Sequence, residues 1–322
     1  MTRIRKPVNL LPHQVMARVQ ELVETQDYNI GLSNIPEAWK LSKGEGVKVV
    51  VLDTGTPDHP DITLAGSKSF IPGYNIDGCG HGTHVAGIIR ATQGNGIGIV
   101  GIAPKCDLYT GAVLDMNGSG DIQPIVDGIM WAVDIVKADI INMSLGLDAS
   151  APDVRVMHKA CDYAKAKGVT VICAAGNEFG KVGQPAKYNT VVAVAAVDDA
   201  RKHASFSNCG PEVDFATGGV NVFSTYLNKG YAKLSGTSMA SPVLSGIAAL
   251  ILGASLAKGV KLTPDQLYDQ IRKIAFDLGA GGFDSTYGWG IPIFQSETTG
   301  VDIPDTPEPA KSWWSRFMDW LF

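Results

Sequence analysis

Short runs of β-branched residues alternate with helix-like segments along most of this chain, and this alternation limits the folds that it can adopt. The β-branched runs cover residues 47–52, 108–114, 140–143, 169–173 and 191–194. Apolar residues recur at spacings of three and four within residues 122–133, 156–164 and 239–256. Strands that alternate with helices pair in parallel, because each helix crosses over the sheet between two strands. We therefore predict an α/β fold with a mostly parallel twisted sheet flanked by helices on both faces.

The composition excludes several classes of protein. Hydrophobic residues make up 45% and charged residues 18% of the 322 residues, which indicates a folded chain with a sizeable core rather than a disordered one. The formal net charge of −5 offers no basic field to a phosphate backbone, so we expect no nucleic-acid partner. The five cysteines are scattered and odd in number, which suits reduced thiols better than a disulfide framework.

Export and membrane signals are also weak. The apolar run at residues 8–11 is shorter than the roughly 7–15 residues of a secretory signal core. Even the run at residues 247–256 falls short of the roughly 18 apolar residues that span a membrane. We therefore expect no transmembrane span and a cytoplasmic location.

The two ends of the chain differ from its middle. Residues 13–24 place Val15 and Val19 at helical spacing, which predicts a short amphipathic helix in an N-terminal extension. Residues 303–309 are rich in proline and predict an extended linker. The aromatic segment 311–322 behind this linker has two interpretations: a tail that packs on its own domain or frays, or an amphipathic helix that contacts a membrane surface or a partner.

Four polar residues lie beside glycines at the ends of apolar strands or at the starts of apolar helices. Asp53 ends a buried strand in VLDTG, His81 lies in CGHGTHVAG, and Asn177 follows another buried strand in AAGNE. Ser238 lies in SGTSMASP at a helix start, where free N–H groups favour a reaction that forms an oxyanion. Each residue alone has a simpler explanation as a cap, a turn residue or a hydrogen-bonded core group. Their shared setting favours one common site, because parallel sheets place sites at the carboxyl ends of their strands.

Six motifs extend this pattern: VLDTG, HGTHVAG, INMSLG, AAGNE, ASFSNCGPE and SGTSMASP. In their order and separations they resemble the subtilisin-like serine proteases, and the layout is closest to the intracellular subtilisins. The resemblance covers about residues 28–293 and implies one catalytic domain at 26–298, with an extension at 1–25 and a linker and tail at 299–322. It implies a catalytic triad of Asp53, His81 and Ser238, with Asn177 as the oxyanion donor.

The resemblance also implies where substrate binds. An extended peptide would lie between Gly118, Ser119 and Gly120 on one side and Ser144, Leu145 and Gly146 on the other. Main-chain pairing of this kind makes few side-chain demands, so broad specificity is expected. The S1 pocket would be lined by residues 144–146, 174–176 and the region near 183, which carry little charge and imply apolar P1 residues.

Calcium is the cofactor that the resemblance implies. The loop Gln93–Ile99 resembles the high-affinity calcium loop of the family. The implied ligands are Asn95, Asp61 and Gln26 through their side chains and Ile97 and Ile99 through their carbonyls. A glycine-rich loop without a metal is the alternative.

The N-terminal extension suggests how activity would be controlled. Leu10, Leu11 and Pro12 resemble the short inhibitory segment of intracellular subtilisins, although His13 stands where the family usually has tyrosine. Proline lacks an N–H and has a fixed φ, so Pro12 is expected to shift the scissile bond out of register. We therefore expect a zymogen that is inhibited by its own N-terminal segment, with an ordinary disordered terminus as the alternative. The resemblance also suggests a homodimer.

Other functions fit parts of the sequence. Residues 96–101 match GxGxxG but follow a helix-like segment, whereas a dinucleotide fingerprint follows a strand and opens a helix. Asp53-Thr-Gly resembles half of an aspartic protease site but has no second copy. Cys79, His81 and His84 could bind zinc but lack a fourth ligand. A catalytically silent scaffold that binds polypeptides and a narrow-specificity processing protease are the remaining alternatives.

Overall fold

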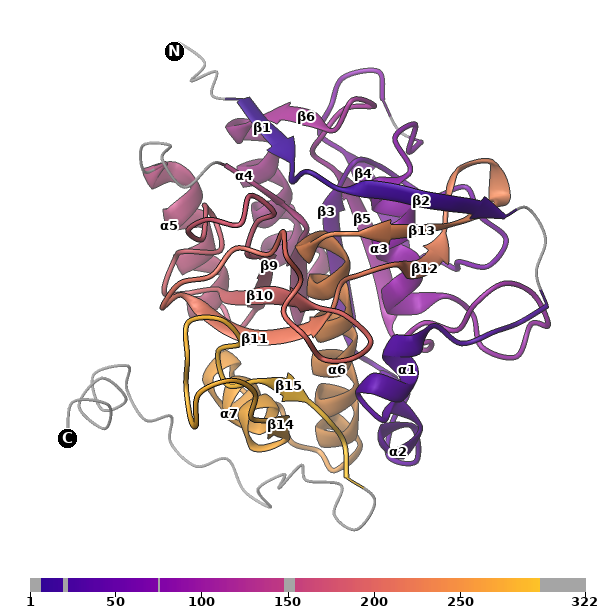
Figure 1. Cartoon of the computed structure of the whole chain (residues 1–322). Coiled ribbons are helices and arrows are strands. Elements are labelled where there is room, and N and C mark those ends of the chain that lie inside the picture. Colours follow the sequence, from indigo (N-terminus) through magenta and orange to yellow (C-terminus); the bar gives the residue numbers. More distant parts are fainter. Residues whose placement is uncertain (1–6, 20–22, 75, 148–153, 296–322) are drawn as a thin grey trace.

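The computed structural model describes residues 7–19, 23–74, 76–147 and 154–295. The predicted linker and aromatic tail lie outside these residues. Seven strands form one sheet in the order β11-β10-β9-β7-β3-β5-β4, and every neighbouring pair is parallel (Figure 1). The strands are β3 (Lys48–Asp53), β4 (Gly66–Ser69), β5 (Asp107–Ala112), β7 (Ile140–Met143), β9 (Thr170–Ala174), β10 (Val192–Val197) and β11 (Val213–Gly218). The α/β prediction is confirmed.

Helices cover both faces of this sheet. The helices are α3 (His81–Arg90), α4 (Ile122–Trp131), α5 (Arg155–Ala166), α6 (Thr237–Ala257) and α7 (Pro264–Lys273), and α4 continues as a π-helix at Ala132–Val136. Successive side chains of a strand point to opposite faces. Val49 and Val51 of β3 therefore join one core with α3, α6 and α7, whereas Val50 and Leu52 join a second core with α4 and α5.

Helix α6 runs through the centre of the molecule (Figure 1). By length and composition it is apolar enough to cross a membrane, but 94% of its apolar window is buried inside the protein. Such burial is typical of a core helix. The start of α7 shows a capping box, in which Thr263 accepts from the Gln266 amide and Gln266 accepts in return from the Thr263 N–H.

Three smaller sheets and two short helices complete the fold. The sheets are β6-β1-β8, β12-β13-β2 and β14-β15. Their strands are β1 (Pro7–Leu10), β2 (Gln14–Val19), β6 (Ser119–Asp121), β8 (Leu145–Gly146), β12 (Val222–Thr225), β13 (Tyr231–Ser235), β14 (Ala275–Phe276) and β15 (Ile291–Pro292). The helices are α1 (Tyr28–Leu32) and α2 (Ile35–Trp39), and a 3-10 turn covers Leu227–Lys229.

The helix predicted at residues 13–24 is wrong. Residues 14–19 form strand β2, which pairs antiparallel with β13. A helix here would need a surface to bury its apolar stripe, yet Val15 is 43% exposed. The free edge of β13 instead satisfies the main chain of this segment, and the i, i+4 spacing of its valines carries no structural meaning.

Candidate active site

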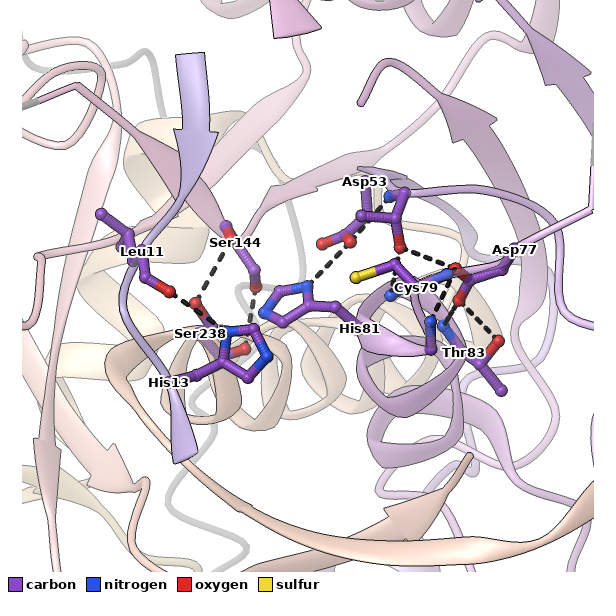
Figure 2. Close-up of polar contacts among 12 residues, drawn as sticks. Leu11, His13, Asp53, Asp77, Cys79, His81, Thr83, Ser144 and Ser238 are labelled. Carbon is purple, nitrogen blue, oxygen red and sulfur yellow. Dashed lines mark hydrogen bonds and ion pairs between the residues drawn. The ribbon is translucent and has the colours of Figure 1, made fainter. Parts of the chain in front are cut away.

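The strand order places the candidate residues at one edge of the sheet. The chain passes from β3 to β5 on one side and later to β7 on the other, so the order reverses at β3. Asp53 is the last residue of β3, and α3 begins at His81. Ser238 is the second residue of α6. Ligands bind outside the carboxyl ends of strands at such a reversal, which is where these side chains meet (Figure 2).

Asp53 and His81 form a buried pair. The Asp53 Oδ1 atom accepts hydrogen bonds from His81 Nδ1 at 2.8 Å and from the Thr54 N–H at 2.7 Å. An ionised carboxylate can only accept, so the proton of a neutral His81 ring lies on Nδ1. The Nε2 atom is therefore the basic nitrogen, and it has no hydrogen-bond partner among the described residues.

Ser238 lies in the first turn of α6, with its hydroxyl oriented toward a neighbouring strand. Its Oγ donates to the Ser144 carbonyl at 3.3 Å rather than to His81. The Ser144 Oγ donates in return to the Ser238 carbonyl at 2.9 Å. Pro242, four residues further along α6, has no N–H to bond that carbonyl, so Ser144 replaces the missing helical bond. This exchange fixes the turn that carries Ser238.

The orientation of the Asn177 amide is set by Thr237, a residue that sequence reasoning did not single out. The Asn177 Oδ1 atom accepts from the Thr237 N–H and from its hydroxyl, both at 2.8 Å. The amide nitrogen must then point the other way, into the site. There it donates to the Pro12 carbonyl at 2.6 Å. A carbonyl of the N-terminal segment thus occupies the predicted oxyanion position.

The two predicted substrate-binding segments already hold a strand. Strand β1 lies between β6 and β8 and pairs antiparallel with both. Val8 lies opposite Gly120, Asn9 opposite Gly146, and the Leu10 N–H donates to the Gly118 carbonyl at 2.7 Å. The structure therefore places the expected inhibitory segment in the expected cleft.

The chain turns at Pro12 and leaves the cleft along another sheet. The His13 ring packs on the His81 ring with centroids 4.9 Å apart, and its Nδ1 lies 3.3 Å from the Leu11 carbonyl oxygen. Burial and the neighbouring His81 lower the pKa of His13. Leu11 is buried, and its side chain packs over Gly146. The segment thus contacts two of the candidate residues, His81 and Asn177.

Asp77 is a further residue that sequence reasoning missed. Its Oδ1 accepts from the hydroxyl of Thr54 and from the N–H groups of Cys79 and Gly80. Its Oδ2 accepts from the N–H and hydroxyl of Thr83 (Figure 2). Asp77 therefore ties the residue after Asp53 to the first turn of α3. An acidic residue just before an apolar helix is a capping signal that could have identified it.

Gly80 shows why glycine precedes His81. Its φ is +90°, and a Cβ there would lie 2.7 Å from the ring of Tyr226. Only glycine accepts both the backbone conformation and the close contact, so the glycine before His81 is a requirement of the local fold.

The residues expected to bind calcium are brought together in part. Asp61 is buried, and its two carboxylate oxygens accept from the Asn95 amide at 2.7 Å and the Ile99 N–H at 2.9 Å. Burial raises the pKa of Asp61. Ile97 lies in the same loop, paired with Val23 through an isolated β-bridge.

Gln26 follows Thr25, which pairs with Ile99 of this loop through an isolated β-bridge. It lines a cavity whose walls include Asp199 and Lys233 but neither Asp61 nor Asn95. Glu24 binds the loop instead, through the N–H groups of Gly94 and Asn95. Sequence reasoning did not anticipate Glu24, because nothing local to it indicates a partner 70 residues away.

Two alternative sites lose their structural basis. The His84 Nε2 lies 3.1 Å from the Val222 carbonyl oxygen and 3.0 Å from that of Ala232, so this nitrogen carries a proton and is not a metal ligand. Burial lowers the pKa of His84 to about 3 and raises that of Cys79 to about 11, which makes Cys79 a poor ligand near neutral pH. The GxGxxG segment 96–101 lies in a loop between α3 and β5 and opens no helix.

A buried Asp–His pair, a serine at a helix N-terminus and an amide donor at a sheet reversal define a serine hydrolase site. Comparison with known proteins narrows the class. Residues 44–290 match the Subtilase family. The chain is 40% identical over 280 residues to the minor extracellular protease Epr of Bacillus subtilis strain 168, which covers 85% of this chain and 42% of that protein.

Two other relatives align over most of their length. Subtilisin DY of Bacillus licheniformis is 42% identical over 257 residues, covering 77% of this chain and 89% of the relative. An intracellular serine protease of Paenibacillus polymyxa is 39% identical over 292 residues, covering 86% and 88%. The chain thus spans less than half of Epr but most of these two proteins. It belongs to the subtilase family and is a serine endopeptidase of the subtilisin type.

Proposed function

We propose that this chain hydrolyses peptide bonds within polypeptides through an acyl-enzyme formed on Ser238. The observation that carries the proposal is the buried Asp53–His81 hydrogen bond of 2.8 Å, which leaves Nε2 of His81 as a base facing the N-terminus of α6. A silent polypeptide-binding scaffold would not need a buried carboxylate and imidazole in this arrangement, because burying such groups is costly.

The residues would act in sequence. The Ser238 hydroxyl turns from the Ser144 carbonyl toward His81, which takes its proton as Oγ attacks the peptide carbonyl carbon. The oxyanion is held by the Asn177 amide and the Ser238 N–H, the place that the Pro12 carbonyl takes in the structure. Asp53 stabilises the imidazolium. His81 then protonates the leaving amine, and water releases the acyl group by the reverse sequence.

The nucleophile can be tested directly. Ser238→Ala is expected to fold normally but to lose covalent labelling by a fluorophosphonate and, on the scale measured in subtilisin, about 10⁶-fold of turnover. The matched control is Ser245→Ala, a buried serine about two turns further along α6. Labelling that persists in Ser238→Ala would show that the nucleophile is misassigned.

Substrate selection would rest mainly on main-chain pairing. Strands β6 and β8 offer backbone groups to a peptide strand on both sides, as β1 shows. The buried Leu11 over Gly146 supports a preference for apolar P1 residues. These features favour broad specificity over the narrow-specificity processing alternative.

The same contacts support a zymogen in which residues 1–20 inhibit the site. The segment fills the peptide cleft, places the Pro12 carbonyl on Asn177 and packs His13 on His81. A chain that begins at residue 21 is expected to hydrolyse peptides that the full chain does not. Equal rates for the two chains would rule out autoinhibition.

Calcium is the proposed cofactor, with Asp61, Asn95 and the carbonyls of Ile97 and Ile99 as ligands and Gln26 as a further candidate. These are hard oxygen donors of the kind that Ca²⁺ prefers, and a cation would offset the burial of the Asp61 charge. Bound there, the ion would stabilise the loop and take no part in bond cleavage.

Location and assembly are proposed on relatives alone. The intracellular serine protease of Paenibacillus polymyxa supports a cytoplasmic location and, with the intracellular layout, a homodimer. Fractionation and light scattering of the purified protein test the two proposals.

A further inference from the structure

Strand β2 continues the path of β1 through the active site. The pairing of β1 ends with Leu10 opposite Leu145, and the Leu11 side chain packs over Gly146. We therefore take Leu11 as the residue before the scissile bond of a substrate that follows this path, and Pro12 as the first residue after it. Residues 14–19 are then the third to the eighth residues after that bond. All of them lie along β13, beyond the residues that contact the catalytic groups (Figure 1).

The pairing of β2 with β13 is long and antiparallel. Gln14 lies opposite Ser235, Val15 opposite Leu234, and Ala17 opposite Lys233. It ends with Val19 opposite Tyr231, and the one shift in register falls between Lys233 and Leu234. In the sheet order β12-β13-β2, strand β2 is the only described neighbour of β13 on that side. Removal of residues 1–20 would therefore leave one edge of β13 unpaired.

The side chains of Gln14, Val15 and Ala17 contribute little to this contact, because all three are exposed, Val15 to 43%. At these residues the attraction comes from the main chain, as it does when a peptide adds a strand to a sheet edge. An edge that is satisfied by main-chain groups accepts any extended chain that reaches it, whatever its sequence.

We propose that, once the N-terminal segment is removed, β13 binds the leaving side of the substrate as an added antiparallel strand. The occupant is an extended polypeptide with about eight residues after the scissile bond, and the preferred substrates are unfolded chains rather than short peptides. This inference rests on the proposed peptidase function and extends its binding site beyond the catalytic cleft.

The length of the leaving side provides the first test. The chain from residue 21 is given quenched fluorescent peptides that share one acyl side and carry two, four, six, eight or twelve residues after the bond. The ratio kcat/KM is expected to rise at least tenfold between two and eight residues and to level off by twelve. A ratio that is already constant from two residues onward overturns the proposal.

Backbone N-methylation separates strand pairing from other causes of a length effect. Alternate N–H groups of a strand point toward its neighbour, and the register shift at Met16 interrupts this alternation at the fifth position. Methylation should therefore lower kcat/KM at alternate positions on each side of the fifth residue, which is left unmethylated. The peptides methylated at the intervening positions are the matched controls. A uniform effect, or none, contradicts pairing with β13.

Exchanging the charges of Lys233 and of the substrate residue opposite it tests the register of the proposed pairing. Lys233 has an exposed side chain and lies opposite the sixth residue after the bond. Glutamate at that position is expected to raise kcat/KM about two- to fivefold over lysine, and Lys233→Glu should reverse the preference. The neighbouring seventh position, on the opposite face of the strand, should not respond. An unchanged preference in Lys233→Glu counts against this register.

Failure of this inference can be told apart from failure of the proposed function. A p-nitroanilide with the same acyl side has no residues after the bond, and its hydrolysis must disappear in Ser238→Ala. If that hydrolysis occurs without any effect of leaving-side length, only the role of β13 is wrong. If it never occurs, the peptidase proposal itself fails.

Discussion

Asp77 makes five hydrogen bonds yet touches none of the reacting atoms. It positions His81 by holding the first turn of α3 against Thr54, whose N–H binds Asp53. At the scale of single residues, the proposed triad depends on this carboxylate, because the imidazole would have to meet both its partners within hydrogen-bond distance.

Replacement of Asp77 should therefore affect catalysis more than binding. Asp77→Asn in the chain from residue 21 offers one acceptor oxygen in place of two and leaves donors unpaired at the start of α3. We expect kcat to fall about ten- to a hundredfold with little change in KM, measured with a peptide p-nitroanilide.

The control for this variant is Asp284→Asn. Asp284 likewise accepts from backbone N–H groups, those of Ala280, Thr286 and Tyr287, but it lies in a loop away from the triad. It should lower the melting temperature and leave kcat unchanged. Equal losses of kcat in both variants would reduce Asp77 to a general stabilising role.

The pKa of His13 predicts how pH affects inhibition. Burial and His81 lower this pKa in the docked segment, so docking favours the neutral ring. As the pH falls below the ordinary value of about 6.5, the free segment binds a proton that the docked one does not, and docking weakens by up to about tenfold per pH unit. The docked segment therefore binds most tightly above about pH 6.5, and its affinity for the site falls as the pH falls below that value.

Peptide binding can isolate this effect. The dissociation constant of peptide 1–20 for the Ser238→Ala chain from residue 21 is measured between pH 7.5 and 5.5 by calorimetry. A His13→Phe peptide keeps an aromatic ring without a titratable nitrogen, so His81 contributes equally to both curves. The two peptides should diverge below about pH 6.5. Parallel curves would exclude His13 as the cause.

At the scale of elements, the connection between β1 and β2, which contains Pro12, is the part of the segment that would decide whether it inhibits the enzyme or is cut by it. The pairing of β1 and the packing of Leu11 over Gly146 suit Leu11 as the residue before the scissile bond, but Asn177 donates to the next carbonyl, that of Pro12. The oxyanion donor and the backbone register thus select different bonds. Proline contributes by its fixed φ and its missing N–H.

Pro12→Ala should remove this conflict. In peptide 1–20, the variant is expected to be cut after Leu11 by the chain from residue 21, whereas the original peptide inhibits and stays intact. Mass spectrometry identifies the products, and the Ser238→Ala enzyme controls for contaminating proteases. Equal resistance of both peptides would show that Pro12 does not set the register.

At the scale of the whole molecule, calcium should stabilise the fold without taking part in chemistry. Calcium at about a hundred times its dissociation constant adds about 2.7 kcal/mol to the free energy of unfolding, equivalent to a rise in melting temperature of about 5–10 °C. A chelator should reverse that rise, as measured by differential scanning calorimetry.

The variants Asp61→Asn and Asp198→Asn form a pair for this measurement. Both remove one loop carboxylate, but Asp198 only accepts from the nearby N–H groups of Ala200 and Lys202. The calcium-dependent rise should disappear in Asp61→Asn and persist in Asp198→Asn. A rise that survives in Asp61→Asn would place the ion elsewhere.

The sequence alone predicted the α/β class, five of the seven strands of the main sheet and the helices α4, α5 and α6. Hydrophobic periodicity is a local signal, and these elements form where it predicts them, whereas the short strand β4 and the strand β11 carried no signal that was recognised. The candidate triad residues could be named because each lies at the end of such an element, next to a motif that resembles one known family.

Only the tertiary structure decided where the N-terminal segment lies and what it pairs with. Its valines are spaced like a helix, yet residues 14–19 form a strand because β13, more than 200 residues away, has an edge to pair. The roles of Asp77, Thr237 and Glu24 arise in the same way from partners that local sequence does not reveal. The secondary-structure propensity of a segment contributes only a small free energy. Pairing and burial against distant residues contribute more, so they decide the structure wherever the fold offers a partner.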